Sequence, residues 1–172
     1  RALNTLMPAQ SFAIALLDPE DDERFSYVYA ADRDTDSEPW AVRWPRSRLA
    51  HVARTRTPMR LTVATTERMV ESGAIELYGL PPSAWVGAPL IVGDRVIGAI
   101  GARHDDADDP YVDGDVDLMA FIAREVAVGI ERKRAGDELA ALTRTLEERV
   151  VARTAELDRV IRGARCSLYR RL

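Results

Sequence analysis

This sequence has a single cysteine, no long apolar run and no excess of positive charge. Among 172 residues there is one cysteine, Cys166, so neither an intrachain disulfide nor a paired-cysteine metal or redox site can form. No apolar run approaches the roughly 20 residues that a membrane-spanning helix needs. Lysine and arginine together number 24 against 28 acidic residues, a net charge of -4. We therefore expect a cytoplasmic segment that contacts neither membrane nor nucleic acid.

Motifs of the common catalytic, metal and phosphate sites are also missing. His51 and His104 have no partner at HxxxH or HExxH spacing. Gly98 and Gly101 lie in an apolar run without GxGxxG or GK[ST], and we expect them to let a helix pack closely on a sheet. There is no GxSxG elbow. We expect no catalytic residue, no metal and no enzyme activity here, with an enzyme of unrecognised type as the remote alternative.

The residues that are present build one globular domain. Hydrophobic residues make up 47% of the chain and charged residues 30%, which is enough apolar material for a core. The pattern predicts a strand pair, a short helix, a strand, a second short helix and a tight hairpin. In chain order these are residues 12–17 with 25–29, a helix capped by Ser47 with Leu49 and Val52 inward, residues 59–65, a helix opened by Thr66, and residues 85–92 with 95–102 around Gly93-Asp94. Residues 32–45 read as a polar loop rich in Trp and Pro.

A long helix is expected from about residue 115 to 161. Asp113 or Asp115, at the end of an acidic loop, suits its N-terminus. Its first half has a broad apolar face, as in a helix packed on a sheet: Leu118, Phe121, Ile122, Val126 and Ile130. Its second half has a narrow stripe suited to a partner helix: Leu139, Leu142, Leu146, Val150, Arg153, Leu157 and Ile161.

The spacing of this stripe predicts a coiled-coil homodimer. Steps of 3, 4 and 4 residues repeat if Arg153 is admitted, which gives an 11-residue period and a nearly straight or slightly right-handed coil. A charged Arg153 at the seam lowers local stability, so we expect the coil to lie close to two alternative packings.

Three segments together resemble the GAF domain of bacterial signalling proteins: FAIALLDPEDDERFSYVYAAD, PPSAWVGAPLIVGDRVIGAIGARHDD and the helix that contains IERKRA. The resemblance spans roughly residues 7–157. It implies an α+β fold with a central antiparallel sheet, helices on both faces, a small-molecule pocket on one face, and an exit helix leading to a histidine kinase, a diguanylate cyclase or another GAF domain. Without a domain cysteine we expect no covalent bilin cofactor and no methionine sulfoxide reduction. The cyclic-nucleotide motif Asn-Lys-Phe-Asp-Glu is absent too, so the ligand class stays open.

The resemblance also indicates domain bounds and a pocket. We expect the end of a helix at residues 1–7, a GAF sensory domain at 8–131, a signalling coiled-coil helix at 132–165, and a linker or the start of the next module at 166–172. The candidate ligand-binding residues are Tyr27, Trp40, Arg43, Trp44, Tyr78, Trp85 and Arg103. Either arginine would suit an anionic ligand. The expected function is sensory input passed through a dimeric helix to an output domain, and the alternative is a ligand-free dimerisation scaffold.

Overall fold

The computed structural model describes residues 9–21, 23–32, 35–37, 40–78, 83–105 and 111–169, without the side chains of 32, 35–37, 40, 158 and 160–169. The chain divides into two compact units, residues 1–129 and 130–172. The helix end expected at residues 1–7 lies outside the described range. Within that range, no helix is long and apolar enough to cross a membrane.

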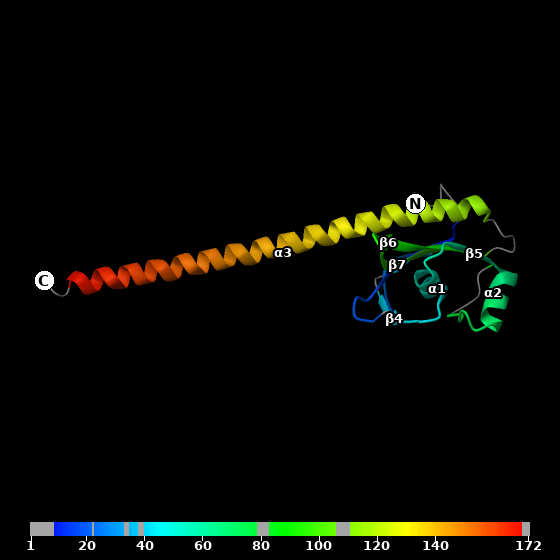
Figure 1. The fold of residues 1–172 in the computed structure, drawn as a ribbon, viewed down its shortest axis with the longest axis horizontal. Helices are drawn as coiled ribbons and strands as arrows, with labels where there is room; N and C mark the ends of the chain where they lie inside the picture. Colours follow the sequence, from blue (N-terminus) through cyan, green and yellow to red (C-terminus); the bar gives the residue numbers. More distant parts are fainter. Residues whose placement is uncertain are drawn as a thin grey trace. The chain divides into compact units, whose positions relative to one another are not determined.

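A single antiparallel sheet forms the centre of the first unit (Figure 1). Over the described residues it has seven strands: β1 (Ser11–Leu17), β2 (Arg24–Asp32), β3 (Thr35–Ser37), β4 (Trp40–Arg43), β5 (Met59–Thr62), β6 (Ala84–Val92) and β7 (Arg95–His104). Their order is β3-β2-β1-β7-β6-β5, and β4 also pairs with β2. The predicted central antiparallel sheet is confirmed. The expected loop at residues 32–45 is corrected, because β3 and β4 pair with β2 there.

The hairpin of β6 and β7 forms as the sequence predicts, around a two-residue turn at Gly93-Asp94. Gly93 has a φ of 57°, which glycine adopts without strain. Gly98 allows the neighbouring strand β1, and not a helix, to approach closely. A Cβ there would lie 2.2 Å from the Ala15 carbonyl oxygen, where the register of β1 on β2 shifts between Ile14 and Ala15. The expectation that Gly98 accommodates a helix is therefore wrong.

Helix α1 (Arg48–Thr55) begins where its cap predicts. The Ser47 hydroxyl accepts a 3.1 Å hydrogen bond from the Ala50 N–H, and Leu49 and Val52 are buried as expected. Helix α2 (Val63–Glu71) begins earlier than predicted. Thr62 is its N-cap, since Thr62 and Thr65 exchange side-chain-to-backbone hydrogen bonds in a capping box. This box overrides the strand pattern, so the expected strand at 59–65 ends at Thr62.

Helix α3 (Asp113–Tyr169) is longer than expected at both ends. It begins with an Asp115 carboxylate that accepts a 2.8 Å hydrogen bond from the Val112 N–H. Met119, Ala123 and Ala127 are its most buried residues, each at 1% exposure or less. The buried face of α3 is therefore rotated about the helix axis from the predicted one. Phe121, which was expected on the buried face, is 55% exposed.

The helices of the first unit lie on both faces of the sheet, as predicted. In Figure 1, α1 lies on one side of β6 and β7, and the first turns of α3 lie on the other. One buried cluster joins α1 to the sheet through Leu49, Val52, Phe25, Tyr27 and Trp85. A candidate site on the α1 face therefore lies across the sheet from the first turns of α3.

Candidate ligand pocket

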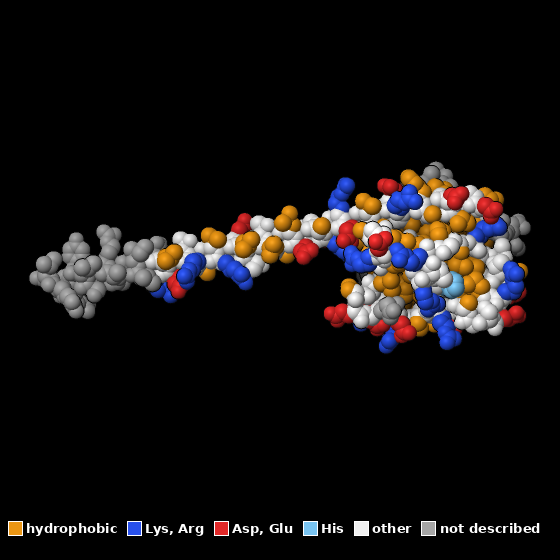
Figure 2. Space-filling view, viewed as in Figure 1, with side chains coloured by type: hydrophobic (Ala, Val, Ile, Leu, Met, Phe, Trp, Pro, Cys, Tyr) orange, Lys and Arg blue, Asp and Glu red, His pale blue; other side chains and the backbone are white. Residues whose placement is uncertain are grey.

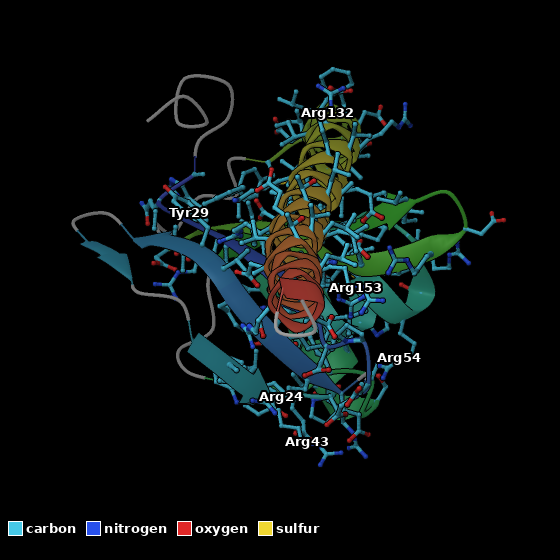
Figure 3. The ribbon with its side chains drawn as sticks, turned by 90° about the vertical axis from the view of Figure 1, so that its left-hand side faces the viewer. Arg24, Tyr29, Arg43, Arg54, Arg132 and Arg153 are labelled. Atoms are coloured by element: carbon cyan, nitrogen blue, oxygen red, sulfur yellow. The ribbon has the colours of Figure 1, made fainter. Side chains whose placement is uncertain are left out.

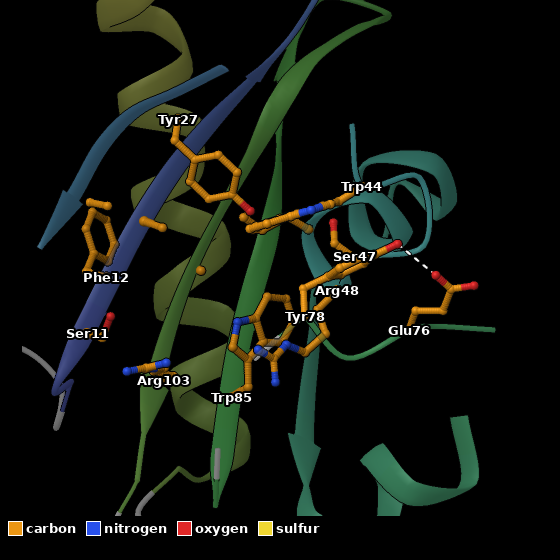
Figure 4. A pocket seen from close by; sticks show the side chains of 14 residues that line it. Ser11, Phe12, Tyr27, Trp44, Ser47, Arg48, Glu76, Tyr78, Trp85 and Arg103 are labelled. Carbon is orange, nitrogen blue, oxygen red and sulfur yellow. Dashed lines mark hydrogen bonds between the residues drawn. The ribbon is translucent and has the colours of Figure 1, made fainter. Parts of the chain in front are cut away.

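A cavity of about 200 Å³ opens on the α1 face of the sheet (Figure 4). Three kinds of segment surround it: strands β1, β2, β6 and β7, the N-terminus of α1, and the loops that carry Trp44 and Tyr78. The lining residues are Ser11, Phe12, Ala13, Tyr27, Ala30, Trp44, Ser47, Arg48, Leu49, Glu76, Tyr78, Trp85, Gly101 and Arg103. Aromatic rings and two guanidinium groups dominate this set.

The Trp85 indole lies flat on the sheet because two glycines leave room for it. A Cβ on Gly87 would lie 2.2 Å from Trp85 Cη2, and a Cβ on Gly101 would lie 2.7 Å from Trp85 Cζ2. Gly87 and Gly101 are register partners on β6 and β7. Gly101 thus makes room for an aromatic ring, and the expectation that it accommodates a helix is wrong.

Three more aromatic rings form a wall beside the indole. Tyr27 meets Trp44 edge to face, with ring centroids 5.8 Å apart, and Trp44 stacks on Tyr78 at 4.9 Å. The Tyr78 hydroxyl donates a 2.8 Å hydrogen bond to Glu76, and Glu76 pairs with Arg46 at 3.1 Å. Burial, followed by this hydrogen bond, raises the pKa of Tyr78 above its usual value. The wall is therefore held by a chain of contacts from β2 to the loop after α2.

Arg48 brings a buried positive charge to the cavity. It is the first residue of α1, and its guanidinium carbon lies 5.8 Å from the centroid of the Trp85 ring. Burial and then the nearby Arg103 charge lower the pKa of Arg48 to about 10, so it stays charged at neutral pH. Among the described residues, its buried Nη1 has no hydrogen-bond partner. A buried donor of this kind favours a ligand that brings an acceptor.

Arg103 and Tyr27 complete the polar part of the lining. The Arg103 guanidinium pairs with Asp105 at 3.5 Å. Burial raises the pKa of Tyr27 to about 12, although the Arg48 charge acts in the opposite direction. Tyr27 is therefore a neutral hydroxyl under physiological conditions. With two guanidinium groups and a neutral Tyr27 hydroxyl in its lining, the cavity can hold an anionic group.

Five of the seven predicted pocket residues line this cavity: Tyr27, Trp44, Tyr78, Trp85 and Arg103. Arg43 does not. It lies beside Arg24 at the sheet edge (Figure 3), 65% exposed, and pairs with Glu23 at 2.9 Å and Asp21 at 3.7 Å. Trp40 pairs with Tyr27 through the backbone of β4, and its side chain is outside the described set.

Arg48, Ser47 and Glu76 are pocket residues that the sequence reading missed. A clue was present for Arg48, which lies four residues before the inward-facing Val52 and hence on the same side of α1. Glu76 follows the break after α2, where periodicity gives no direction. No group of His, Cys, Asp and Glu residues in the described part of the chain is arranged to hold a metal ion.

The residues predicted for the dimer lie on the second half of α3. Leu139, Leu142, Leu146, Val150 and Leu157 are more than half exposed. Arg153 pairs with Glu156 on the same helix at 2.7 Å, and the side chain of Ile161 lies outside the described set. Their role in a dimer stays a prediction.

The fold is an α+β module with a cavity on one face of an antiparallel sheet. The family model described as GAF domain matches residues 1–132. The chain belongs to the GAF domain family, whose members are sensory and regulatory input domains of signalling proteins. No curated protein matches it.

Solved structures of GAF domains have the same fold. The second GAF domain of DevS from Mycobacterium smegmatis is 20% identical, with 80% of this chain and 91% of that chain covered and a TM-score of 0.62. The GAF domain of the Acinetobacter phosphoenolpyruvate-protein phosphotransferase is 14% identical, with coverages of 77% and 78% and a TM-score of 0.61. A free methionine-R-sulfoxide reductase from Thermoplasma acidophilum is 14% identical, with coverages of 73% and 82% and a TM-score of 0.56. At these identities the likeness extends to the fold alone.

Proposed function

We propose that this chain is a cytoplasmic sensory input domain that binds a small molecule in the cavity and reports its presence through α3. The observation that carries the proposal is the cavity itself, lined by aromatic rings and by Arg48, whose buried Nη1 has no hydrogen-bond partner among the described residues. Concave, largely apolar sites with a few directed polar groups are the usual form of small-molecule sites. Five lining residues also belong to the set expected from the family resemblance.

Strand β7 provides a route from the cavity to α3. Successive side chains of a strand face opposite sides of a sheet. Gly101 and Arg103 line the cavity, so Ile100 and Ala102 face the other side, where Met119 and Ala123 of α3 are buried. A ligand that shifts Arg103 moves a strand on which α3 packs. Binding can then favour one packing of α3 over another.

The second half of α3 supports the output half of the proposal. Its exposed leucines and valines form a stripe, and hydrophobic side chains recur along the helix between charged ones (Figure 2). An isolated stripe of this length is poorly stable in water. We propose that two copies pair in parallel through it and pass the state of the pocket to an output domain of the histidine kinase or diguanylate cyclase type.

The ligand half is tested by a screen for thermal stabilisation with small metabolites and cyclic nucleotides, followed by hydrogen exchange on α3 with any compound that binds. We expect a binding compound to change amide exchange at residues 113–129, because this segment packs on the sheet that forms the pocket. A compound that stabilises the protein and leaves exchange along α3 unchanged would contradict transmission.

The dimer half is tested by Leu146→Asp, which places a charge in the centre of the stripe. We expect sedimentation to show a weaker dimer by at least about tenfold, since burying an unpaired carboxylate is costly. Ala141→Asp is the matched control, because it adds the same charge on the opposite side of the helix. Equal effects of the two variants would contradict pairing through the stripe.

A ligand-free dimerisation scaffold is the second candidate, and the same exposed stripe favours it because the stripe needs no pocket. Substitution of Trp85 by Ala separates the two. If the chain is a scaffold, Trp85→Ala leaves the dimer affinity unchanged, and added metabolites affect the variant and wild type alike. A sensor loses its ligand response and keeps the dimer.

A further inference from the structure

We infer that the cavity accepts a small carboxylate with a single ring, its carboxylate held by Arg48 beside Arg103 and its ring packed among Trp44, Tyr78 and Trp85. The inference rests on the proposed ligand-sensing function and names the chemical class of its ligand. It is carried by three independent features of the cavity: its charge, its aromatic lining and its size.

Charge comes first. The charged residues of the lining are Arg48, Arg103 and Glu76, a net of one positive charge. Glu76 is already paired with Arg46, and Arg103 with Asp105, whereas no carboxylate of the described residues forms an ion pair with Arg48. A monoanion would balance Arg48, and a dianion would leave a negative charge in excess. The flat guanidinium also matches a flat carboxylate, which accepts two parallel hydrogen bonds from it.

The unpaired donor shows where the carboxylate would lie. Arg48 Nη1 is buried and has no hydrogen-bond partner among the described residues, while its guanidinium carbon lies 5.8 Å from the Trp85 ring centroid. Figure 4 shows Arg48 and Arg103 both near Trp85, and the Arg103 charge acts on Arg48. An oxygen placed there relieves the desolvation cost of the donor and the repulsion between two like charges.

Lining and size define the rest of the ligand. The indole of Trp85 and the stacked pair of Trp44 and Tyr78 offer ring faces and edges that suit another aromatic ring. An apolar cavity of roughly 150 Å³ accommodates benzene. The cavity of about 200 Å³ therefore has room for one ring and one carboxylate.

Benzoate is the probe, and benzamide is its neutral control of nearly the same shape. Calorimetry on the full chain is expected to show benzoate binding at least about tenfold tighter than benzamide, because the interaction with Arg48 is charge-assisted. Phenyl phosphate is expected to bind more weakly than benzoate. Equal affinity for benzamide, tighter binding of phenyl phosphate, or no binding of benzoate would each overturn the inference.

The role of Arg48 is tested in the same experiment. Arg48→Gln is expected to weaken benzoate binding at least about tenfold, and Arg48→Lys to weaken it less, because lysine keeps the charge and loses the planar fork. Arg43→Gln is the matched control, since Arg43 lies outside the cavity and its loss leaves affinity unchanged. Wild-type affinity in Arg48→Gln overturns the assignment. If Arg48→Gln does not fold, the comparison of benzoate with benzamide on wild type decides.

The experiments distinguish an error in the inferred ligand class from an error in the proposed sensory function. If another metabolite stabilises the protein and changes exchange along α3 while benzoate does not bind, the ligand class is wrong and the sensory function stands. If benzoate binds through Arg48 and exchange along α3 does not change, the ligand class stands and transmission fails.

Discussion

The two faces of the central sheet carry different kinds of side chain. Ile100 and Ala102 of β7 and Met119, Ala123 and Ala127 of α3 are each at most 1% exposed, and the alternation of the strand places Ile100 and Ala102 on the α3 face. On the α1 face, aromatic rings and arginines surround a cavity of about 200 Å³. Small apolar side chains can pack without gaps, whereas large rings that meet at edges leave space.

This difference separates stability from recognition within one layer of strands. The α3 face contributes close packing, which tolerates little change. The α1 face carries a buried charge whose donor is unpaired among the described residues, a feature that costs folding free energy and that a ligand can use. Substitutions on the two faces should therefore differ in size and in the property that they change.

The largest effect is expected from Ala123→Asp on the α3 face. An unpaired carboxylate would be buried at a position that is 1% exposed, at a cost on the order of 4 kcal/mol, which is a large share of the stability of a typical domain. Circular dichroism and urea denaturation check this. Ala141→Asp, on the exposed second half of the same helix, is expected to leave domain stability unchanged to within about 0.5 kcal/mol. Similar losses in both variants would remove the contrast.

Gly101→Val on the α1 face should have an intermediate effect. The new side chain would occupy the place of the Trp85 ring, and forcing the ring into the cavity costs about 1–3 kcal/mol. Gly129→Ala is the control, since a Cβ there meets nothing within 4 Å and removal of a helical glycine stabilises by up to about 1 kcal/mol. Urea denaturation measures both. A stable Gly101→Val protein with an unchanged Trp85 environment would contradict the glycine cradle.

Arg48→Met tests the α1 face further. We expect it to change the free energy of unfolding less than Gly101→Val does. The variant loses a cation–π contact of about 1–2 kcal/mol and also loses an unpaired buried donor that costs roughly 1–3 kcal/mol. These terms offset, so the free energy of unfolding should stay within about 1 kcal/mol of wild type. A loss of more than about 3 kcal/mol would show that Arg48 is part of the core and not reserved for a ligand.

The effect that is absent at neutral pH is a pH dependence due to Tyr27. Its pKa in the folded protein is raised to about 12 from the ordinary 10, so the folded state keeps a proton that the unfolded state releases first. Below pH 10 the group contributes no pH dependence, and its contribution to stability is lost as pH rises from 10 toward 12. Urea denaturation at pH 9 and 11 should show wild type losing more stability than Tyr27→Phe. Equal losses would contradict the burial of this hydroxyl.

Much of the fold could be predicted from the sequence because its signals are local. The hairpin of β6 and β7 follows from two apolar runs around Gly93-Asp94, and α1 from the Ser47 cap. The start of α2 was missed because a threonine pair outweighed strand propensity. Strand β4 was missed because it forms only by pairing with β2, a contact between distant residues.

The pocket was less predictable because its residues meet only through the topology. Trp44 and Tyr78, which the sequence singled out as aromatic residues in loops, both line the cavity, and their role in binding stays a prediction. The position of Arg43 outside the cavity could not be predicted from the pattern, because the pairing of β4 with β2 places it beside Glu23. The buried face of α3 consists of Met119, Ala123 and Ala127, whereas the larger Phe121 that periodicity favoured is exposed.

The place of Trp44 and Trp85 gives the protein an optical property of its own. The chain has three tryptophans, and these two line the cavity. Replacement of Trp40 by Phe would leave an indole stacked on Tyr78 and an indole beneath a guanidinium as the only tryptophan emitters. Their fluorescence would report occupancy of the pocket directly, without an attached dye and without knowledge of the output domain.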